Sequence, residues 1–80
     1  MTTRDQLRTY LFGTLIPTPA ASWPADDADL LAFGMDSLRI MQLLVYVEQK
    51  LGVRLPDHEV TPERIENVQS LVEWIETHRK

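Results

Sequence analysis

Apolar residues recur along this chain with the period of a helix and never with the strict alternation of a strand. The first such stripe is formed by three leucines: Leu7, Leu11 and Leu15. Thr3 followed by Gln6 offers a capping box at its start. The pattern therefore predicts a first helix from about residue 4 to residue 15.

Prolines interrupt the chain immediately after this helix. Pro17, Pro19 and Pro24 alternate with small residues and break both helix and strand, so residues 16–35 are predicted to form one long connection. A loop of this length in a small domain needs apolar anchors or a function. The expected anchors are Phe12, Trp23, Leu30, Leu31 and Phe33.

A second helix is predicted over residues 37–51, with Asp36 as its N-cap and Gly52 just after its end. One stripe has the spacing of a buried face: Ile40, Leu43, Leu44, Val47 and Leu51. A further apolar stripe, with Gln42 and Glu48 beside it, comprises Leu38, Met41 and Val45. Two interpretations stay open: the helix is buried nearly all round, or its second stripe is exposed and docks partners.

Two more helices follow. Thr61, Pro62 and Glu63 form a typical helix start, and the helix that they begin can only be short. The last helix ends near His78 and begins either at Asn67 as its cap or at a competing capping box of Ser70 and Glu73. Its apolar face comprises Val68, Leu71, Val72 and Ile75. The prediction is an all-α four-helix bundle, with three longer helices, a short third helix and a long first loop, in a single domain over residues 1–80.

Composition narrows the possible functions. With 12 acidic and 8 basic residues, the net charge of −4 argues against nucleic acid as a partner. The chain has no cysteine, so any thiol chemistry must come from outside it. The longest strictly apolar run, residues 43–47, is too short for a signal peptide or a membrane span. We expect a soluble, cytoplasmic monomer with no membrane partner.

Ser37 stands at the start of the central helix in the sequence GMDSL, residues 34–38. A nucleophilic serine needs a nearby base, and neither His58 nor His78 belongs to a recognisable catalytic motif. The stretch also lacks the G-x-S-x-G elbow, so a serine hydrolase is nearly excluded and the chain is not expected to be an enzyme. Helix capping explains Asp36 and leaves Ser37 free.

Residues 33–75 resemble an acyl or peptidyl carrier protein. The resemblance lies in D-S-L followed by a fifteen-residue apolar helix, then GVRLP and the VQSL helix, and the rest of the chain fits the same fold. It implies a discrete carrier on which a phosphopantetheinyl transferase attaches 4′-phosphopantetheine to Ser37, and no catalysis by the carrier itself. Gly34, Asp36 and Leu38 would frame this attachment site.

The charges of the second helix differ from those of carriers in bacterial fatty-acid synthesis, whose second helix is usually strongly acidic. Here Arg39, Glu48 and Lys50 are its charges, two cations and one acid for a sum of +1. The acidic residues lie elsewhere, at Asp26, Asp27, Asp29, Asp36, Asp57, Glu59, Glu63 and Glu66. This helix resembles that of carriers in specialised pathways, which implies an acyl or aminoacyl thioester, a cognate loading ligase and downstream transferring enzymes.

The expected partner surface surrounds Ser37 and comprises Leu38, Arg39, Met41, Gln42, Val45 and Ile65. The alternative function is that of an unmodified helical adaptor, which would dock partners through the same apolar face. Modification by a transferase separates the two.

Overall fold

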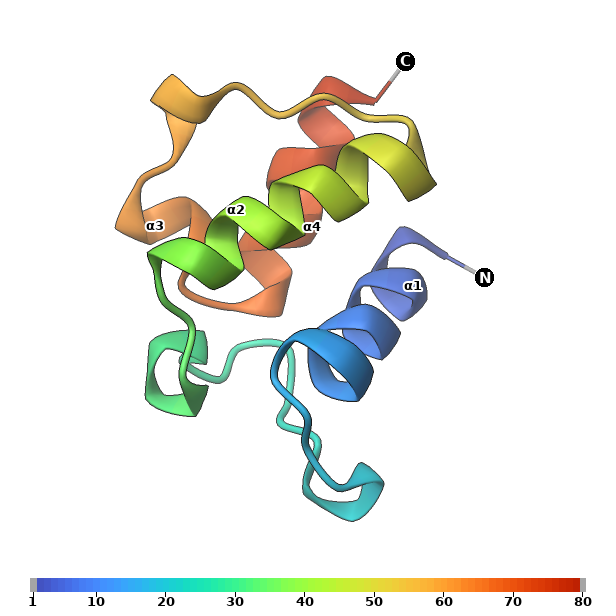
Figure 1. Ribbon diagram of the computed structural model, residues 1–80, viewed down its shortest axis with the longest axis vertical. Helices are drawn as coiled ribbons and strands as arrows, with labels where there is room; N and C mark the ends of the chain where they lie inside the picture. Colours follow the sequence, from blue (N-terminus) through green and yellow to red (C-terminus); the bar gives the residue numbers. More distant parts are fainter. Residues whose placement is uncertain (1, 80) are drawn as a thin grey trace.

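The computed structural model describes residues 2–79 and shows four α-helices and no strand in that range (Figure 1). The α-helices are α1 (Thr3–Tyr10), α2 (Ser37–Tyr46), α3 (Pro62–Ile65) and α4 (Val68–His78). α1, α2 and α4 pack around a common core, and the short α3 lies between the long α2–α3 connection and α4. The all-α fold class is confirmed.

α1 begins one residue earlier than the expected capping box implies. Thr2 has extended backbone and its hydroxyl accepts the N–H of Asp5 at 3.1 Å, which satisfies one of the free donors of the first turn. Thr3 already lies inside the helix, so the predicted capping box of Thr3 and Gln6 is wrong. The helix continues as a π-helical segment, η1 (Leu11–Leu15), so helical structure ends where the sequence predicted.

The long first connection contains two short 3₁₀ turns, η2 (Ala20–Ser22) and η3 (Leu30–Phe33). Phe12 and Leu30 are fully buried, and Trp23 packs on the core with its ring 5.7 Å from that of Phe12. The expectation that Leu31 and Phe33 also anchor the loop is wrong, because both are exposed. A single 3₁₀ turn presents only one side to the core, and Leu30 occupies it.

Asp26 fastens the middle of this connection to two helices. Its carboxylate pairs with Arg4 and, at 2.8 Å, with Arg8 on α1, while its backbone carbonyl accepts the N–H of Gln69 on α4. The N–H of Leu30 donates to the carbonyl of Glu66 at 2.7 Å. The connection is therefore held by specific polar contacts as well as by apolar anchors.

α2 continues through a π-helical segment, η4 (Val47–Leu51), to Gly52, whose φ of 70° lies in the left-handed region that favours glycine. The predicted span 37–51 and both of its ends are confirmed. The predicted buried face also holds: Leu43, Leu44 and Val47 are buried, and Ile40 and Leu51 are partly buried against the core.

The structure decides between the two possible starts of α4. The side-chain oxygen of Asn67 accepts the N–H of Ser70 at 2.7 Å, so Asn67 is the cap. Thr61 precedes Pro62, the first residue of α3, but its side chain makes no capping hydrogen bond. The predicted apolar face of α4 is buried at three positions, Val68, Leu71 and Ile75, and half-buried at Val72.

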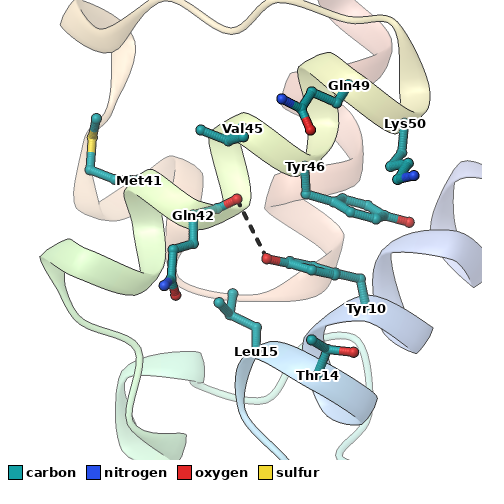
Figure 2. Close-up of a pocket in the computed structure, with 9 residues that line it drawn as sticks. All are labelled: Tyr10, Thr14, Leu15, Met41, Gln42, Val45, Tyr46, Gln49 and Lys50. Atoms are coloured by element: carbon teal, nitrogen blue, oxygen red, sulfur yellow. Dashed lines mark hydrogen bonds between the residues drawn. The ribbon is translucent and has the colours of Figure 1, made fainter.

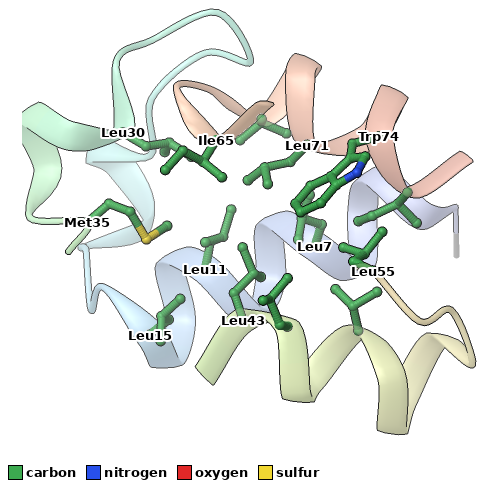
Figure 3. Packing of buried hydrophobic residues seen from close by; sticks show 14 of the residues in the cluster. Leu7, Leu11, Leu15, Leu30, Met35, Leu43, Leu55, Ile65, Leu71 and Trp74 are labelled. Atoms are coloured by element: carbon green, nitrogen blue, oxygen red, sulfur yellow. The ribbon is translucent and has the colours of Figure 1, made fainter. Parts of the chain in front are cut away.

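The core also contains residues that the periodicity did not identify (Figure 3). Trp74 is 2% exposed, and its indole N–H donates to Glu59 at 2.9 Å, which satisfies the one polar atom of a large buried side chain. Three further members come from connecting segments: Met35, Val53 and Leu55. These three residues follow no helical period, so only the packed structure reveals them, whereas Trp74 lies on α4 three residues after Leu71 and fits that period.

Candidate functional site

Ser37 is the first residue of α2, and its side chain is exposed. The chain reaches it from η3 through Gly34, whose φ of 102° is a left-handed conformation that side-chain-bearing residues rarely adopt. Met35 then turns into the core with 5% of its surface exposed. A glycine turn followed by a buried anchor thus presents the Ser37 hydroxyl to solvent at a fixed place.

Asp36 caps α2 as predicted. Its carboxylate accepts the backbone N–H of Arg39 at 2.9 Å and pairs with the Arg39 guanidinium at 2.8 Å. The hydrogen bond from the Arg39 N–H is the main reason why the pKa of the Asp36 carboxyl lies below its usual value, and the guanidinium adds to the effect. Asp36 is therefore an ionised cap directly before the serine.

Arg39 is less available to partners than the sequence suggested. Besides pairing with Asp36, its Nε donates to the carbonyl of Leu15 at 3.2 Å, which ties the start of α2 to the end of η1. Its side chain remains 39% exposed. Arg39 therefore has a structural role at this end of the bundle, whatever contact it makes with a partner.

The site fits a phosphopantetheine group on Ser37. The hydroxyl is exposed, and an anion at the N-terminus of the ten-residue α2 is favoured by the helix dipole. The Asp36 carboxylate already accepts the Arg39 N–H. Fewer free backbone N–H donors therefore remain for a phosphodiester than at a helix N-terminus without a cap. Arg39 offsets the negative charge of Asp36, which reduces repulsion between that carboxylate and a neighbouring phosphodiester.

An apolar stripe runs along α2 beside Ser37. Leu38 is 67% exposed, Met41 52% and Val45 51%, so α2 is not buried all round. Gln42 is also exposed and lies next to this stripe. Ile65 does not belong to the surface: it is 7% exposed and packs in the core, so its expected place in the partner patch is wrong. The four-residue α3 has one inward-facing side, and Ile65 lies on it.

Among residues 2–79, no hydrogen bond joins a histidine to Ser37, and His78 instead contacts Glu59 with 2.6 Å between Nε2 and Oε1. No group of acidic and histidine side chains in the described chain is arranged to hold a metal ion. The described helices are also too short or too polar to cross a membrane.

Known proteins resemble this chain in both sequence and fold. The family described as "Phosphopantetheine attachment site" matches residues 11–75. The acyl carrier protein of Helicobacter pylori strain G27 is 36% identical over 62 residues, which cover 78% of this chain and 69% of that protein.

Two solved structures extend the comparison. One is the Bradyrhizobium japonicum glycine:[carrier protein] ligase complexed with its cognate carrier protein and an analogue of glycyl adenylate; its matching chain is 25% identical, with a TM-score of 0.74 over 95% of this chain and 99% of that one. The other is described as an FAD-dependent dehydrogenase, with 32% identity and a TM-score of 0.66 over 81% of this chain and 95% of that one. From the family match, the identity to acyl carrier proteins and the shared fold, the chain belongs to the phosphopantetheine-dependent carrier proteins, which are not enzymes.

Proposed function

We propose that Ser37 carries 4′-phosphopantetheine and that the protein holds an acyl or aminoacyl group as a thioester at the end of this arm. The observation that carries the proposal is the exposed Ser37 hydroxyl at the N-terminus of α2, inside the region that matches the attachment family. A phosphopantetheinyl transferase would move the group from coenzyme A to this hydroxyl. The arm then supplies the thiol that a chain without cysteine lacks.

An aminoacyl cargo is the more specific form of the proposal. The similar Bradyrhizobium japonicum carrier is bound to a glycine:[carrier protein] ligase, which supports a loading ligase as a partner here. The charges of α2 and η4 also support a carrier of a specialised pathway. This helical stretch has only three charged residues, Arg39, Glu48 and Lys50, and so lacks the acidic surface that general fatty-acid carriers present. Leu38, Met41 and Val45 are the proposed contact for that ligase and for downstream enzymes.

Modification by a broad-specificity phosphopantetheinyl transferase tests the attachment site. Incubated with coenzyme A, the parent protein is expected to gain the mass of one phosphopantetheine, and Ser37→Ala is expected to gain none. The matched control is Ser22→Ala, since Ser22 is exposed in η2 and lies outside the site. Intact-protein mass spectrometry gives the readout. A Ser37→Ala protein that still gains this mass contradicts the assignment, and a parent that gains none supports the unmodified adaptor.

The modified parent also tests the cargo. With ATP, a panel of amino acids and a glycine:[carrier protein] ligase, we expect an aminoacyl thioester that mass spectrometry detects and that hydroxylamine removes. Loading only by an acyl ligase, with no amino acid accepted, would keep the carrier function and reject the aminoacyl form.

A further inference from the structure

A groove lies between α1 with η1 on one side and α2 with η4 on the other (Figure 2). Its volume of about 540 Å³ falls in the range of about 300 to 1,000 Å³ that is typical of ligand sites. The depression directly beside Ser37 is smaller, at about 230 Å³. The lining residues that matter below are Tyr10, Thr14, Met41, Val45, Tyr46 and Lys50.

Two stacked tyrosines make one wall of the groove rigid. The rings of Tyr10 and Tyr46 are 3.9 Å apart between centroids and inclined by only 10°. Tyr46 donates its hydroxyl to the carbonyl of Gln6 at 3.3 Å, and the Tyr10 hydroxyl lies 3.5 Å from the carbonyl of Gln42. A wall that is already ordered loses little conformational entropy on binding, and tyrosine provides both apolar area and polar contact.

The groove is continuous with the exposed stripe of α2. Met41 and Val45 line it and are also two of the three exposed apolar residues that begin beside Ser37. A protein that covers the stripe in order to reach Ser37 therefore meets the mouth of the groove. Apolar anchors that fill a pocket near the centre of an interface typically carry most of the binding energy.

The charge on the groove indicates the chemistry of its occupant. Lys50 is the one charged residue among the described lining residues, and it is exposed and forms no ion pair within residues 2–79. By contrast, Arg8 is paired with Asp26, and Arg39 with Asp36. An unpaired cation at the edge of an apolar groove complements a carboxylate next to an apolar side chain.

We propose that this groove receives an aromatic or aliphatic side chain of the loading ligase, with a ligase carboxylate beside Lys50. The identity of the partner rests on the proposed function. The docking surface then extends from Ser37 along α2 to the tyrosine pair on the α1 side.

Filling the groove tests the proposal. Thr14→Trp places a large side chain in it, and Thr9→Trp makes the same change at an exposed α1 position outside it. The probe is the Bradyrhizobium japonicum glycine:[carrier protein] ligase, and calorimetry measures its dissociation constant for each variant in a Ser37→Ala background. We expect binding weaker by about tenfold or more for Thr14→Trp and a change within about twofold for Thr9→Trp. Circular dichroism checks the fold of both.

Reversing the charge at Lys50 provides a second test of the proposal. Lys50→Glu is expected to weaken binding by about tenfold at low salt, and the loss should shrink at high salt, where such charges are screened. Arg54→Glu is the matched control, an exposed cation outside the groove, and should change binding by no more than about twofold.

Each other outcome overturns the proposal. Thr14→Trp and Lys50→Glu variants that bind like the parent would place the docking surface elsewhere. A ligase that binds no form of the protein would reject this ligase as the source of the occupant. The same titration is repeated on Thr14→Trp with Ser37 intact and modified, and a defect seen only there would show that the prosthetic arm occupies the groove. A parent that sediments as a dimer and a Thr14→Trp variant that sediments as a monomer would show that a second copy of the chain occupies the groove. Because Ser37→Ala carries no arm, these results stay separate from a failure of the Ser37 assignment, which the mass measurement reports.

Discussion

At the scale of single residues, one carboxylate oxygen joins two elements that are far apart in the chain. Oε1 of Glu59, in the 3₁₀ turn η5 (Asp57–Glu59), accepts the Trp74 indole N–H at 2.9 Å and contacts His78 Nε2 at 2.6 Å. The guanidinium of Arg64 lies 3.8 Å away. Glu59 thus holds the α2–α3 connection against α4, and the connection borders the depression beside Ser37.

The same contacts predict a pH dependence of stability. The Trp74 hydrogen bond, then that of His78, holds the pKa of Glu59 below its usual value. The unfolded state therefore binds a proton more readily, with a pKa of about 4.3, so this stabilisation is complete above about pH 5 and is lost as the pH falls through the folded-state pKa. Glu59→Gln should lower the melting temperature at pH 7 and lose less stability on acidification than the parent.

Thermal melts followed by circular dichroism at pH 7, 5, 4 and 3 provide this measurement. The matched control is Glu63→Gln, an exposed acid with no ion pair among residues 2–79. Parallel pH profiles for Glu59→Gln and the parent would contradict the assigned role.

At the scale of elements, α2 has two apolar faces with opposite roles. Leu43 and Val47 are fully buried and Leu44 is 8% exposed, whereas the stripe beginning at Leu38 faces solvent. Helical periodicity identified the first stripe as the buried face, but it left open whether the second stripe is covered as well. α1 and α4 cover the first, and no element of the described chain covers the second.

Alanine substitutions separate the two faces. Leu44→Ala and Leu71→Ala each remove a buried side chain and should lower the free energy of unfolding by about 2 to 5 kcal/mol. Leu38→Ala makes the same change at an exposed position of α2 and should cost less than about 0.5 kcal/mol. Urea titrations measure all three. If Leu44→Ala and Leu71→Ala are as stable as Leu38→Ala, the assignment of the buried face is wrong.

At the scale of the whole molecule, Asp26 connects three segments that the sequence separates. Its carboxylate forms ion pairs with Arg4 and Arg8 of α1, and its backbone carbonyl accepts the N–H of Gln69 near the start of α4. Pairing with Arg4 is the largest reason that the pKa of Asp26 lies below its usual value. The long first loop is therefore part of the folded unit, and its end at η3 is what places Ser37.

Asp26→Asn should loosen this loop while leaving the helices folded. The expected cost is about 0.5 to 1 kcal/mol, because the pairs are partly exposed. Amide hydrogen exchange should accelerate over residues 17–29 more than in α2. Asp27→Asn is the control, since the neighbouring Asp27 is exposed and has no ion pair within the described residues. Equal exchange in the two variants would contradict the role of Asp26.

Local signals determined much of this protein. Helix caps and ends depend on residues three or four positions apart, so Asp36 and Gly52 could be recognised in the sequence, and Asn67 was one of the two starts that it offered for α4. The buried stripes of α2 and α4 follow from the 3.6-residue period for the same reason. The motif around Ser37 is equally local, which is why the family could be predicted before the fold.

Tertiary packing decided the rest, since it depends on residues that meet only after folding. The hydrogen bond from Arg39 to Leu15 joins residues 24 positions apart, and that from Trp74 to Glu59 joins residues 15 positions apart. Helical periodicity therefore predicts neither bond. The burial of Ile65, the exposure of Leu31 and Phe33, and the Tyr10–Tyr46 wall likewise follow from which element lies opposite each side chain. The sequence determined the order of the helices, both ends of the α2 segment and which residues are apolar, and only packing decided which apolar residues stay at the surface.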